Sequence, residues 1–235
     1  DAIQELQVVI SPYDVRQTNF IGGGVNAVTK SGTNTFKGTA YVYHRNENLR
    51  GDTIYGHQIP SAREKDRTTI YVMTFGGPII KNKLFFFVNA EQTKIPSVVN
   101  RWKGSEDGVA DVENFLSRTT LSDLERVSKH VMDKYGYNTG SYTDVPADES
   151  NTKFLVRLDW NINDRHHASL RWSMVDARKN NNTAGDKSLV TNDYAYDFVS
   201  KTISLVLELQ SRLSDNLSNE FHASWTSVRD KRNPG

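Results

Sequence analysis

The feature that most constrains the fold is a set of three long alternating runs, each reversing through a polar turn into a second alternating run. The clearest pair spans residues 153–160 and 167–174, and residues 161–166 form its turn. The other pairs begin at residues 69–75 and 200–210, and long polar stretches separate the three pairs. Because tight turns alternating with long loops are typical of an antiparallel meander, we predict an all-β fold.

Alternation within these runs predicts one apolar and one polar sheet face, because successive strand side chains point to opposite sides. The apolar set includes Phe154, Val156, Leu158, Trp160, Leu170, Trp172 and Met174. The polar set, expected on the other face, comprises Arg157, Asp159, Arg171, Glu208 and Gln210, and Val206 breaks the pattern in its strand. A soluble sandwich with one wet face has the same pattern, so alternation leaves both architectures open.

Strand length favours a membrane barrel. The runs extend over about 10 residues, close to the 9–11 that a tilted strand needs to cross a bilayer, whereas soluble strands cluster around 5–6. Bulky aromatic residues near the strand ends, such as Trp160, Trp172 and Trp225, suit the interfacial girdles of outer-membrane barrels.

Composition removes several classes of function. With 29 basic and 28 acidic residues the net charge is +1, which gives no electrostatic basis for nucleic-acid binding. The absence of cysteine excludes disulfides, thiolate metal sites and a cysteine nucleophile. The six histidines show no ligand spacing and no nucleophile stands beside a base and its orienting group, so we predict neither an enzyme nor a metal or cofactor site.

Residues 92–150 are too many for a structureless connection and should contain a helix. Ser122 and Glu125 have capping-box spacing, apolar residues follow at helical intervals, and Gly136 is placed as a stop. A weaker helix is predicted around residues 112–116.

Two segments resemble one family. Residues 20–34, FIGGGVNAVTKSGTN, lead into a strand at Gly38 and resemble the end of a TonB-dependent receptor plug domain passing into its barrel. Residues 3–8 and 11–16 resemble the preceding plug strand and turn. Residues 75–87, FGGPIIKNKLFFF, resemble the first periplasmic hairpin of the Oar-like receptors common in Bacteroidetes.

The resemblance implies that residues 1–35 are the C-terminal part of a plug domain. Residues 36–235 would then be the first seven or so strands of a transmembrane β-barrel that closes at about 22 strands, with a helical extracellular loop at about 105–136. The plug–barrel junction is expected at Gly22, Gly23, Gly24, Asn26 and Lys30. The glycines would allow positive φ and close backbone approach, whereas a phosphate-binding loop would need a glycine directly before Lys30.

The resemblance also implies a function, which is ligand binding and energy-coupled uptake across the outer membrane of a Gram-negative bacterium. The turns would be periplasmic, the long loops extracellular, and the polar sheet face would line the lumen. Ligand would contact the loop residues Trp102, Tyr137, Tyr142, Tyr194 and Tyr196.

The implied partners are outer-membrane lipid, a surface lipoprotein and the TonB system, which would bind a segment upstream of this chain. The N-terminus lacks the pattern of a signal peptide and the chain stops in mid-pattern, so we expect an internal fragment. The alternative left open is a soluble extracellular β-sandwich that acts as a binding module or adhesin.

Overall fold

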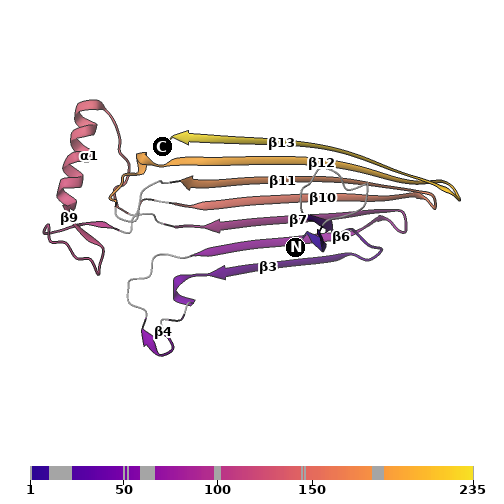
Figure 1. The fold of residues 1–235 in the computed structure, drawn as a ribbon, viewed down its shortest axis with the longest axis horizontal. Helices are drawn as coiled ribbons and strands as arrows, with labels where there is room; N and C mark the ends of the chain where they lie inside the picture. The colour runs from indigo at the N-terminus through magenta and orange to yellow at the C-terminus, as the bar shows by residue number, and fades with distance from the viewer. Residues whose placement is uncertain are drawn as a thin grey trace.

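The computed structural model describes residues 2–10, 23–49, 51, 53–58, 67–97, 102–143, 145, 147–181 and 188–234. Its dominant element is one long sheet, with a small N-terminal hairpin in front of one face of the sheet and a helix beyond one end (Figure 1). Tight turns gather at the opposite end of the sheet from the helix (Figure 1). We call these two ends the turn end and the loop end.

The sheet is an antiparallel meander of seven strands in the order β13-β12-β11-β10-β7-β6-β3. Its strands are β3 (Lys37–Arg45), β6 (Thr68–Ile80), β7 (Leu84–Ile95), β10 (Glu149–Asn163), β11 (His166–Asn181), β12 (Tyr196–Ser214) and β13 (Leu217–Pro234). This confirms the predicted all-β meander. The other sheets of the described chain have two strands each, so the alternative of a sandwich of two large sheets is wrong for this part.

The strands of the three predicted pairs contain 12 to 19 residues, which agrees with the expected length of about 10 residues or more, and the turns are shorter than expected. Strands β10 and β12 contain 15 and 19 residues. Residues 76–80, expected in a turn, continue strand β6, because Gly76 and Gly77 pair with Phe87 and Phe86 of β7. Ladder pairing therefore outweighs the low strand propensity of glycine.

The two sheet faces differ as predicted. We call the face that contacts the N-terminal segment the hairpin face, and the opposite one the open face. The open face carries four successive rows of mostly apolar side chains, including Phe154, Val156, Leu158 and Trp160 of β10. Four rows spaced by about 6.8 Å along the strands span about 20 Å from the first row to the last, which approaches the height of about 25 Å of the lipid-facing band of outer-membrane barrels.

The exposure of large apolar side chains indicates that this band is covered in the intact protein. Trp160, Phe221 and Trp225 are each about half exposed, and large apolar side chains that are exposed together on one face mark a surface for a membrane or a partner. Val206, the predicted exception, lies on the hairpin face and is buried.

Two further strands, β1 (Ile3–Ile10) and β2 (Gly23–Thr29), form the N-terminal hairpin. The two predicted strands are therefore present, while the predicted turn between them and Gly22 lie outside the described residues. Residues 30–36, which we call the junction segment, connect this hairpin to β3.

Close backbone approach occurs at Gly32 and not at Gly24, one of the glycines that were expected to need it. A Cβ on Gly32 would lie 2.3 Å from the Phe86 carbonyl oxygen and 2.9 Å from that of Gly77. Gly24 has nothing within 4 Å of the corresponding position, and it has no positive φ. The expectation that Gly24 is required by tight packing or positive φ is therefore wrong.

The junction segment ends in an aromatic cluster on the open face. The Phe36 ring lies directly over Gly77, where a Cβ would approach the ring to 2.2 Å. Phe36 also stacks on Phe75 at a centroid distance of 5.9 Å, and Phe75 contacts Phe86 at 5.6 Å. Gly77 thus supplies the space that lets Phe36 anchor the entrance to β3.

The loop end contains α1 (Leu121–Tyr135), β8 (Lys103–Ser105), β9 (Leu116–Thr120), β4 (Thr53–Ile54), β5 (His57–Gln58), η1 (Glu47–Leu49) and η2 (Asn192–Tyr194). Helix α1 begins at the predicted place but has Thr120, not Ser122, as its N-cap, and the Thr120 hydroxyl accepts from the Asp123 N–H. Gly136 ends it at φ 65°, as predicted. The weaker helix around 112–116 is wrong, because a turn and strand β9 occupy those residues.

No helix in the described part of the chain is long and apolar enough to cross a membrane.

The close approach at Gly32 predicts a steric effect. Gly32→Ala should lower the free energy of unfolding by about 1–3 kcal/mol, because the added methyl meets backbone that cannot rotate away. Gly24→Ala, with open space around it, should change stability by no more than about 0.5 kcal/mol. Urea unfolding of detergent-solubilised protein, followed by tryptophan fluorescence, measures both values, and equal effects would contradict the assigned contact.

Candidate functional site

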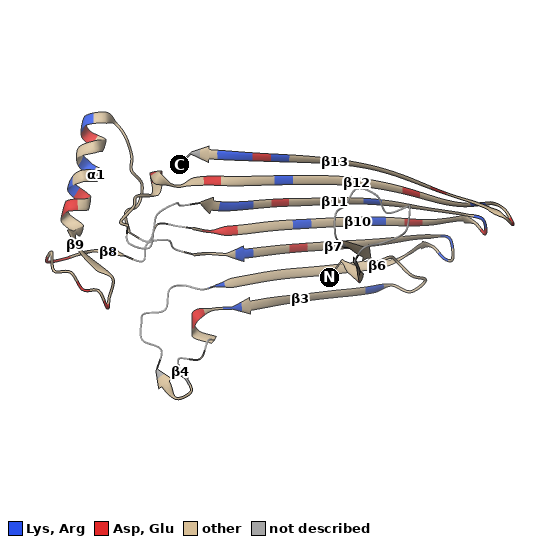
Figure 2. Cartoon of the chain, viewed as in Figure 1, with Lys and Arg blue, Asp and Glu red and all other residues tan. Residues whose placement is uncertain are grey.

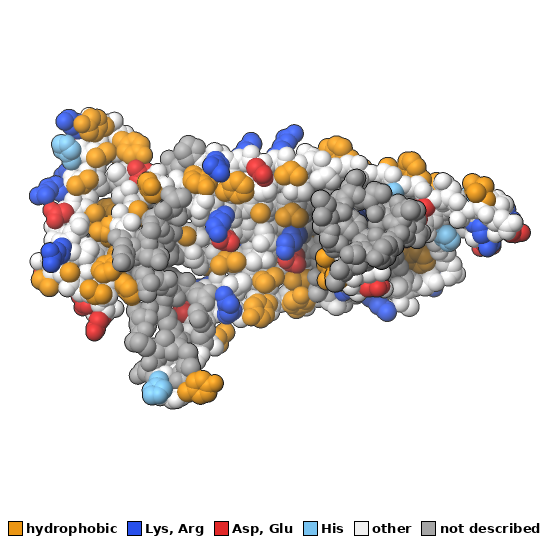
Figure 3. All heavy atoms as spheres, viewed as in Figure 1, with side chains coloured by type: hydrophobic (Ala, Val, Ile, Leu, Met, Phe, Trp, Pro, Cys, Tyr) orange, Lys and Arg blue, Asp and Glu red, His pale blue; other side chains and the backbone are white. Residues whose placement is uncertain are grey.

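The sheet brings the five predicted polar residues onto one face. Strand register places Arg157 opposite Arg171, Ser169 opposite both Asp159 and Glu208, and His167 opposite Gln210, so all five share the hairpin face. Figure 3, which views this face, shows basic and acidic side chains side by side over the strands. Whether this face lines a lumen remains a prediction.

Arg157 is the centre of the contact between sheet and junction. Its Nη1 donates to the Thr29 carbonyl oxygen at 2.8 Å and to the Thr29 hydroxyl at 2.9 Å. Its Nε and Nη2 donate to the Asp159 carboxylate at 3.0 and 2.8 Å. The guanidinium therefore binds a backbone oxygen and a carboxylate in a fixed fork, a geometry for which arginine is suited and lysine is not.

Asp159 completes the contact from the same strand. Its Oδ2 accepts a hydrogen bond of 2.7 Å from the Ser31 hydroxyl. The side chains of Arg157 and Asp159 are only 20% and 18% exposed, and Thr29 is 8% exposed. We call Thr29, Ser31, Arg157 and Asp159 the junction clamp, because they fasten the end of β2 to β10.

Of the predicted junction residues, Lys30 lies beside this clamp without belonging to it, and Asn26 and Gly24 lie farther along β2. Asn26 is exposed opposite Gln7 in the hairpin, and Lys30 donates its backbone N–H to the Ala2 carbonyl oxygen at 2.8 Å. Thr29 and Ser31 flank Lys30, so a period of two places them together on the side opposite to Lys30. Applied to residues 29–31, this alternation is the sequence signal that points to Thr29 and Ser31 as a pair on one side of the segment.

A second contact fixes the junction segment at the turn end. The Asn82 backbone N–H donates to Asn34 Oδ1 at 2.7 Å, and Asn34 Nδ2 donates to Asn82 Oδ1 at 2.5 Å. Asn82 has a φ of 62°, a left-handed conformation that asparagine tolerates. Asn161 of β10 donates to the Asn82 carbonyl oxygen at 3.2 Å, so the first turn, the junction segment and β10 form one unit.

The predicted ligand-contacting aromatic residues do not form one cluster. Trp102 packs edge-on against Phe115 at a centroid distance of 5.7 Å. Tyr196 accepts a hydrogen bond from Asn181 and lies under the guanidinium of Arg232 at 5.3 Å. Tyr142 is half-buried, and Tyr194 is 61% exposed, so Tyr194 is the member of the set most open to a ligand.

Two loops are joined at the loop end. Asn192 donates its backbone N–H to Ser141 at 2.9 Å, and Asp193 donates to Thr139 at 3.2 Å. The buried Thr139 hydroxyl is also 2.7 Å from that of Ser128 in α1. The helix-containing loop and the loop before β12 are therefore one hydrogen-bonded layer.

Tyr137 belongs to this layer. Its side-chain hydrogen bond to Asp193, together with desolvation and the Asp193 charge, raises the pKa of the Tyr137 hydroxyl above its ordinary value. The proton on Tyr137 therefore takes part in joining the two loops.

Within the described ranges, no three side chains of His, Asp or Glu are placed to hold a metal ion together.

Comparison with known proteins agrees with this architecture. A family model described as "Outer membrane beta barrel domain" matches residues 28–103, which include the junction segment and strands β3, β6 and β7. The TonB-dependent transporter Oar of Myxococcus xanthus is 30% identical over 89 residues, which cover 36% of this chain and 8% of that protein. The chain thus spans a small fraction of this relative. No solved structure matches it. These similarities support an outer-membrane location.

The junction clamp predicts a localised effect on stability. Arg157→Ala should lower the free energy of unfolding by about 2 kcal/mol, because the mostly buried Asp159 carboxylate loses its charged donor and the Thr29 carbonyl loses the guanidinium N–H. The matched control is Lys153→Ala on the same strand and face, whose ion pair with Glu91 is more exposed and should be worth no more than about 1 kcal/mol. Urea titration of both variants tests this, and a loss at Lys153 equal to that at Arg157 would contradict the assignment.

Alkaline pH should separate the two joined loops. The folded pKa of Tyr137 is raised, so its stabilising contribution is complete below the unfolded pKa of about 10 and is lost as pH rises through the folded value. Amide hydrogen exchange at residues 139–143, corrected for its intrinsic pH dependence, should accelerate severalfold above this range. Tyr137→Phe should exchange faster at neutral pH and show no such step, and a step retained in that variant would exclude Tyr137 as its source.

Proposed function

We propose that this chain is part of a TonB-dependent outer-membrane transporter of the Oar-like type. In this proposal residues 1–35 are the end of its plug domain and residues 36–235 are the first strands of its barrel. The protein binds a ligand at its extracellular loops and takes it up with energy supplied by the TonB system. Its lipid environment is the outer membrane of a Gram-negative bacterium, and a surface lipoprotein is a further partner.

The observation that carries the proposal is the asymmetry of the sheet. One face holds the N-terminal segment through the junction clamp, with Arg157 bonded to Thr29 and Asp159 to Ser31. The opposite face carries an apolar band of four rows that span about 20 Å. A plug inside a barrel needs both features at once, whereas an exported adhesin that is soluble in water would leave the apolar band without cover.

The proposed orientation places the turn end in the periplasm and the loop end outside the cell. Short periplasmic turns and longer extracellular loops are the rule for such barrels. Here the turns between β10 and β11 and between β12 and β13 contain two residues each, and the loop end carries α1 and the joined loops. On this basis Tyr194 and the layer around Tyr137 are the first candidates for ligand contact.

Surface labelling tests this orientation, because this stretch of sequence contains no cysteine of its own. With a membrane-impermeant maleimide on intact cells, Tyr194→Cys should be labelled, since the side chain is 61% exposed at the loop end. Asp164→Cys, in the turn between β10 and β11, should react only after the outer membrane is permeabilised. The reverse pattern would invert the orientation.

Coupling is tested separately with the full-length protein and the isolated periplasmic domain of TonB. Capture of one by the other in detergent is expected. A protein that resides in the outer membrane but never binds this domain would not be a TonB-dependent transporter.

A further inference from the structure

The open face carries a group of basic side chains just beyond the apolar band, at the loop end. The strand register puts Lys94, Arg178 and Lys231 in one row, and Lys201 and Arg229 in the next row toward the turn end. All five are exposed. We call them the basic belt, and Figure 2 shows the corresponding blue bands near the loop ends of β7, β11, β12 and β13.

Few acidic side chains neutralise the positive charge of the belt. Lys201 lies directly opposite Arg229 on the neighbouring strand, and like charges in such pairs are destabilising. The acidic side chain within the two rows is Asp176, which lies opposite Lys201 and is 3.6 Å from Arg178. In the described part of the chain, Lys94, Lys201, Arg229 and Lys231 have no acidic group within ion-pair distance.

The hairpin face of the same strands is different. There Lys153 pairs with Glu91 at 2.6 Å, Arg157 pairs with Asp159 at 2.8 Å, and Lys179 pairs with Glu149. Lys153, Arg157 and Lys179 on that face therefore have acidic partners within the sheet, although Arg171 has none within ion-pair distance among the described residues, whereas in the belt Arg178 alone has one. A surface of one charge sign attracts a ligand of the opposite sign.

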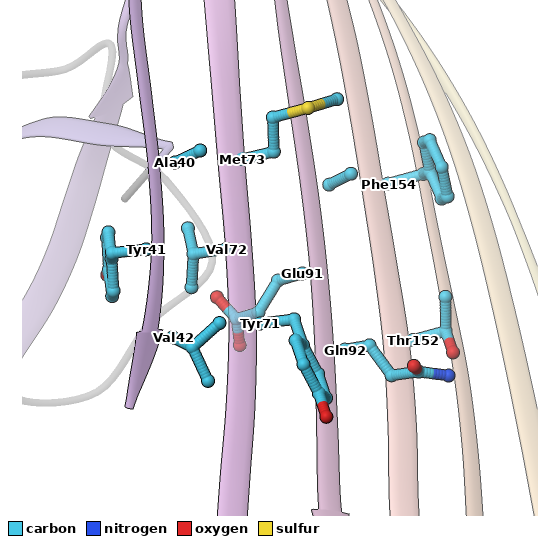
Figure 4. A pocket seen from close by; sticks show the side chains of 11 residues that line it. Ala40, Tyr41, Val42, Tyr71, Val72, Met73, Glu91, Gln92, Thr152 and Phe154 are labelled. Atoms are coloured by element: carbon cyan, nitrogen blue, oxygen red, sulfur yellow. The ribbon is translucent and has the colours of Figure 1, made fainter. Parts of the chain in front are cut away.

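An apolar groove begins beside the belt, one row closer to the turn end than Lys94. It has a volume of about 540 Å³ and lies between β3, β6, β7 and β10. Figure 4 shows Tyr71, Gln92 and Thr152 at one end of the groove and Met73 and Phe154 at the other. Ala40 and Ala90 flank Met73 in one row, and their small side chains leave room for the groove. The groove runs into the apolar band, so a hydrocarbon chain lying there would have its polar end at Lys94.

We propose that the basic belt and this groove bind a phosphorylated, acylated glycolipid of the outer leaflet. Its phosphate groups contact Arg178, Lys201 and Arg229, and one acyl chain occupies the groove beneath Lys94. The choice of leaflet rests on the orientation given under the proposed function. An anionic headgroup joined to hydrocarbon chains fits this site. The uncompensated positive charges lie nearer the membrane surface and the apolar groove lies deeper, in the same order as the headgroup and the acyl chains of a lipid.

The test uses the full-length protein in detergent, titrated with a diphosphorylated glycolipid of the lipid A type and with the same glycolipid after enzymatic dephosphorylation. Native mass spectrometry measures the bound fraction. The wild-type protein should bind the phosphorylated form at least tenfold more tightly than the dephosphorylated form. The double variant Lys201→Gln/Arg229→Gln should lose about tenfold in affinity for the phosphorylated form alone.

Two control variants distinguish an effect of the charges at Lys201 and Arg229 from a general effect of lost charge or misfolding. Lys201→Arg/Arg229→Lys retains the charges and should bind as the wild type does. Lys129→Gln/Lys134→Gln removes two charges from α1 at the loop end and should leave binding unchanged. The chymotryptic digestion pattern of each variant reports whether the barrel is intact.

Equal binding of the two glycolipids, or wild-type affinity in the folded double variant, would overturn the proposal. Tighter binding of phosphatidylglycerol than of the phosphorylated glycolipid would overturn it in favour of an inner-leaflet lipid. Capture of an acidic protein by the belt, with no lipid preference, would also overturn it. None of these three results changes the expected labelling of Tyr194→Cys or the expected capture by TonB. Failure of the lipid proposal is therefore distinguishable from failure of the proposed function.

Discussion

Backbone hydrogen bonds between neighbouring strands hold this chain together to an unusual degree. The described residues bury few apolar side chains, and Val72, Phe87 and Val206 are the buried apolar residues of the large sheet. A conventional core formed between two layers is therefore missing. Order instead comes from continuous antiparallel pairing over strands of 12 to 19 residues from β6 to β13. Everything else in the fold, including both proposed binding surfaces, depends on the register that this pairing sets.

Register matters because it divides one set of strands into two chemically distinct faces. On the hairpin face, Arg157 and Asp159 turn toward Thr29 and Ser31 and satisfy each other within the protein. On the open face, the same strands present an apolar band and then the basic belt. A shift of one residue would exchange these faces throughout a strand. Long, fully paired strands guard against such a shift, because every pair would have to break at once.

The sequence was sufficient for the meander, the order of the strands and the face of each polar residue, since all three follow from a period of two. It was less informative where distant segments meet. Thr29, the partner of Arg157, lies 128 residues away in the chain, and no local sequence pattern predicts that contact. For the same reason Gly32 was overlooked while Gly24 was overvalued: the steric demand at Gly32 comes from Phe86 and Gly77, which only the folded sheet brings near. The N-cap at Thr120 in place of Ser122 is a local error, caused by two hydroxyl residues that both precede the apolar face of α1.

The position of the junction clamp has a mechanical consequence. Thr29, which Arg157 holds, is paired in the hairpin with Ile3, and Lys30 binds the Ala2 carbonyl oxygen. A pulling force applied at Ala2 would thus act right beside the anchored end of β2. It would open the hairpin like a zipper, breaking the bonds between β1 and β2 one pair after another. A force directed along the strands would load all pairs at once, and the hairpin would resist it much more strongly. In this geometry traction would release β1 first, while the clamp and the seven-stranded sheet stay in place.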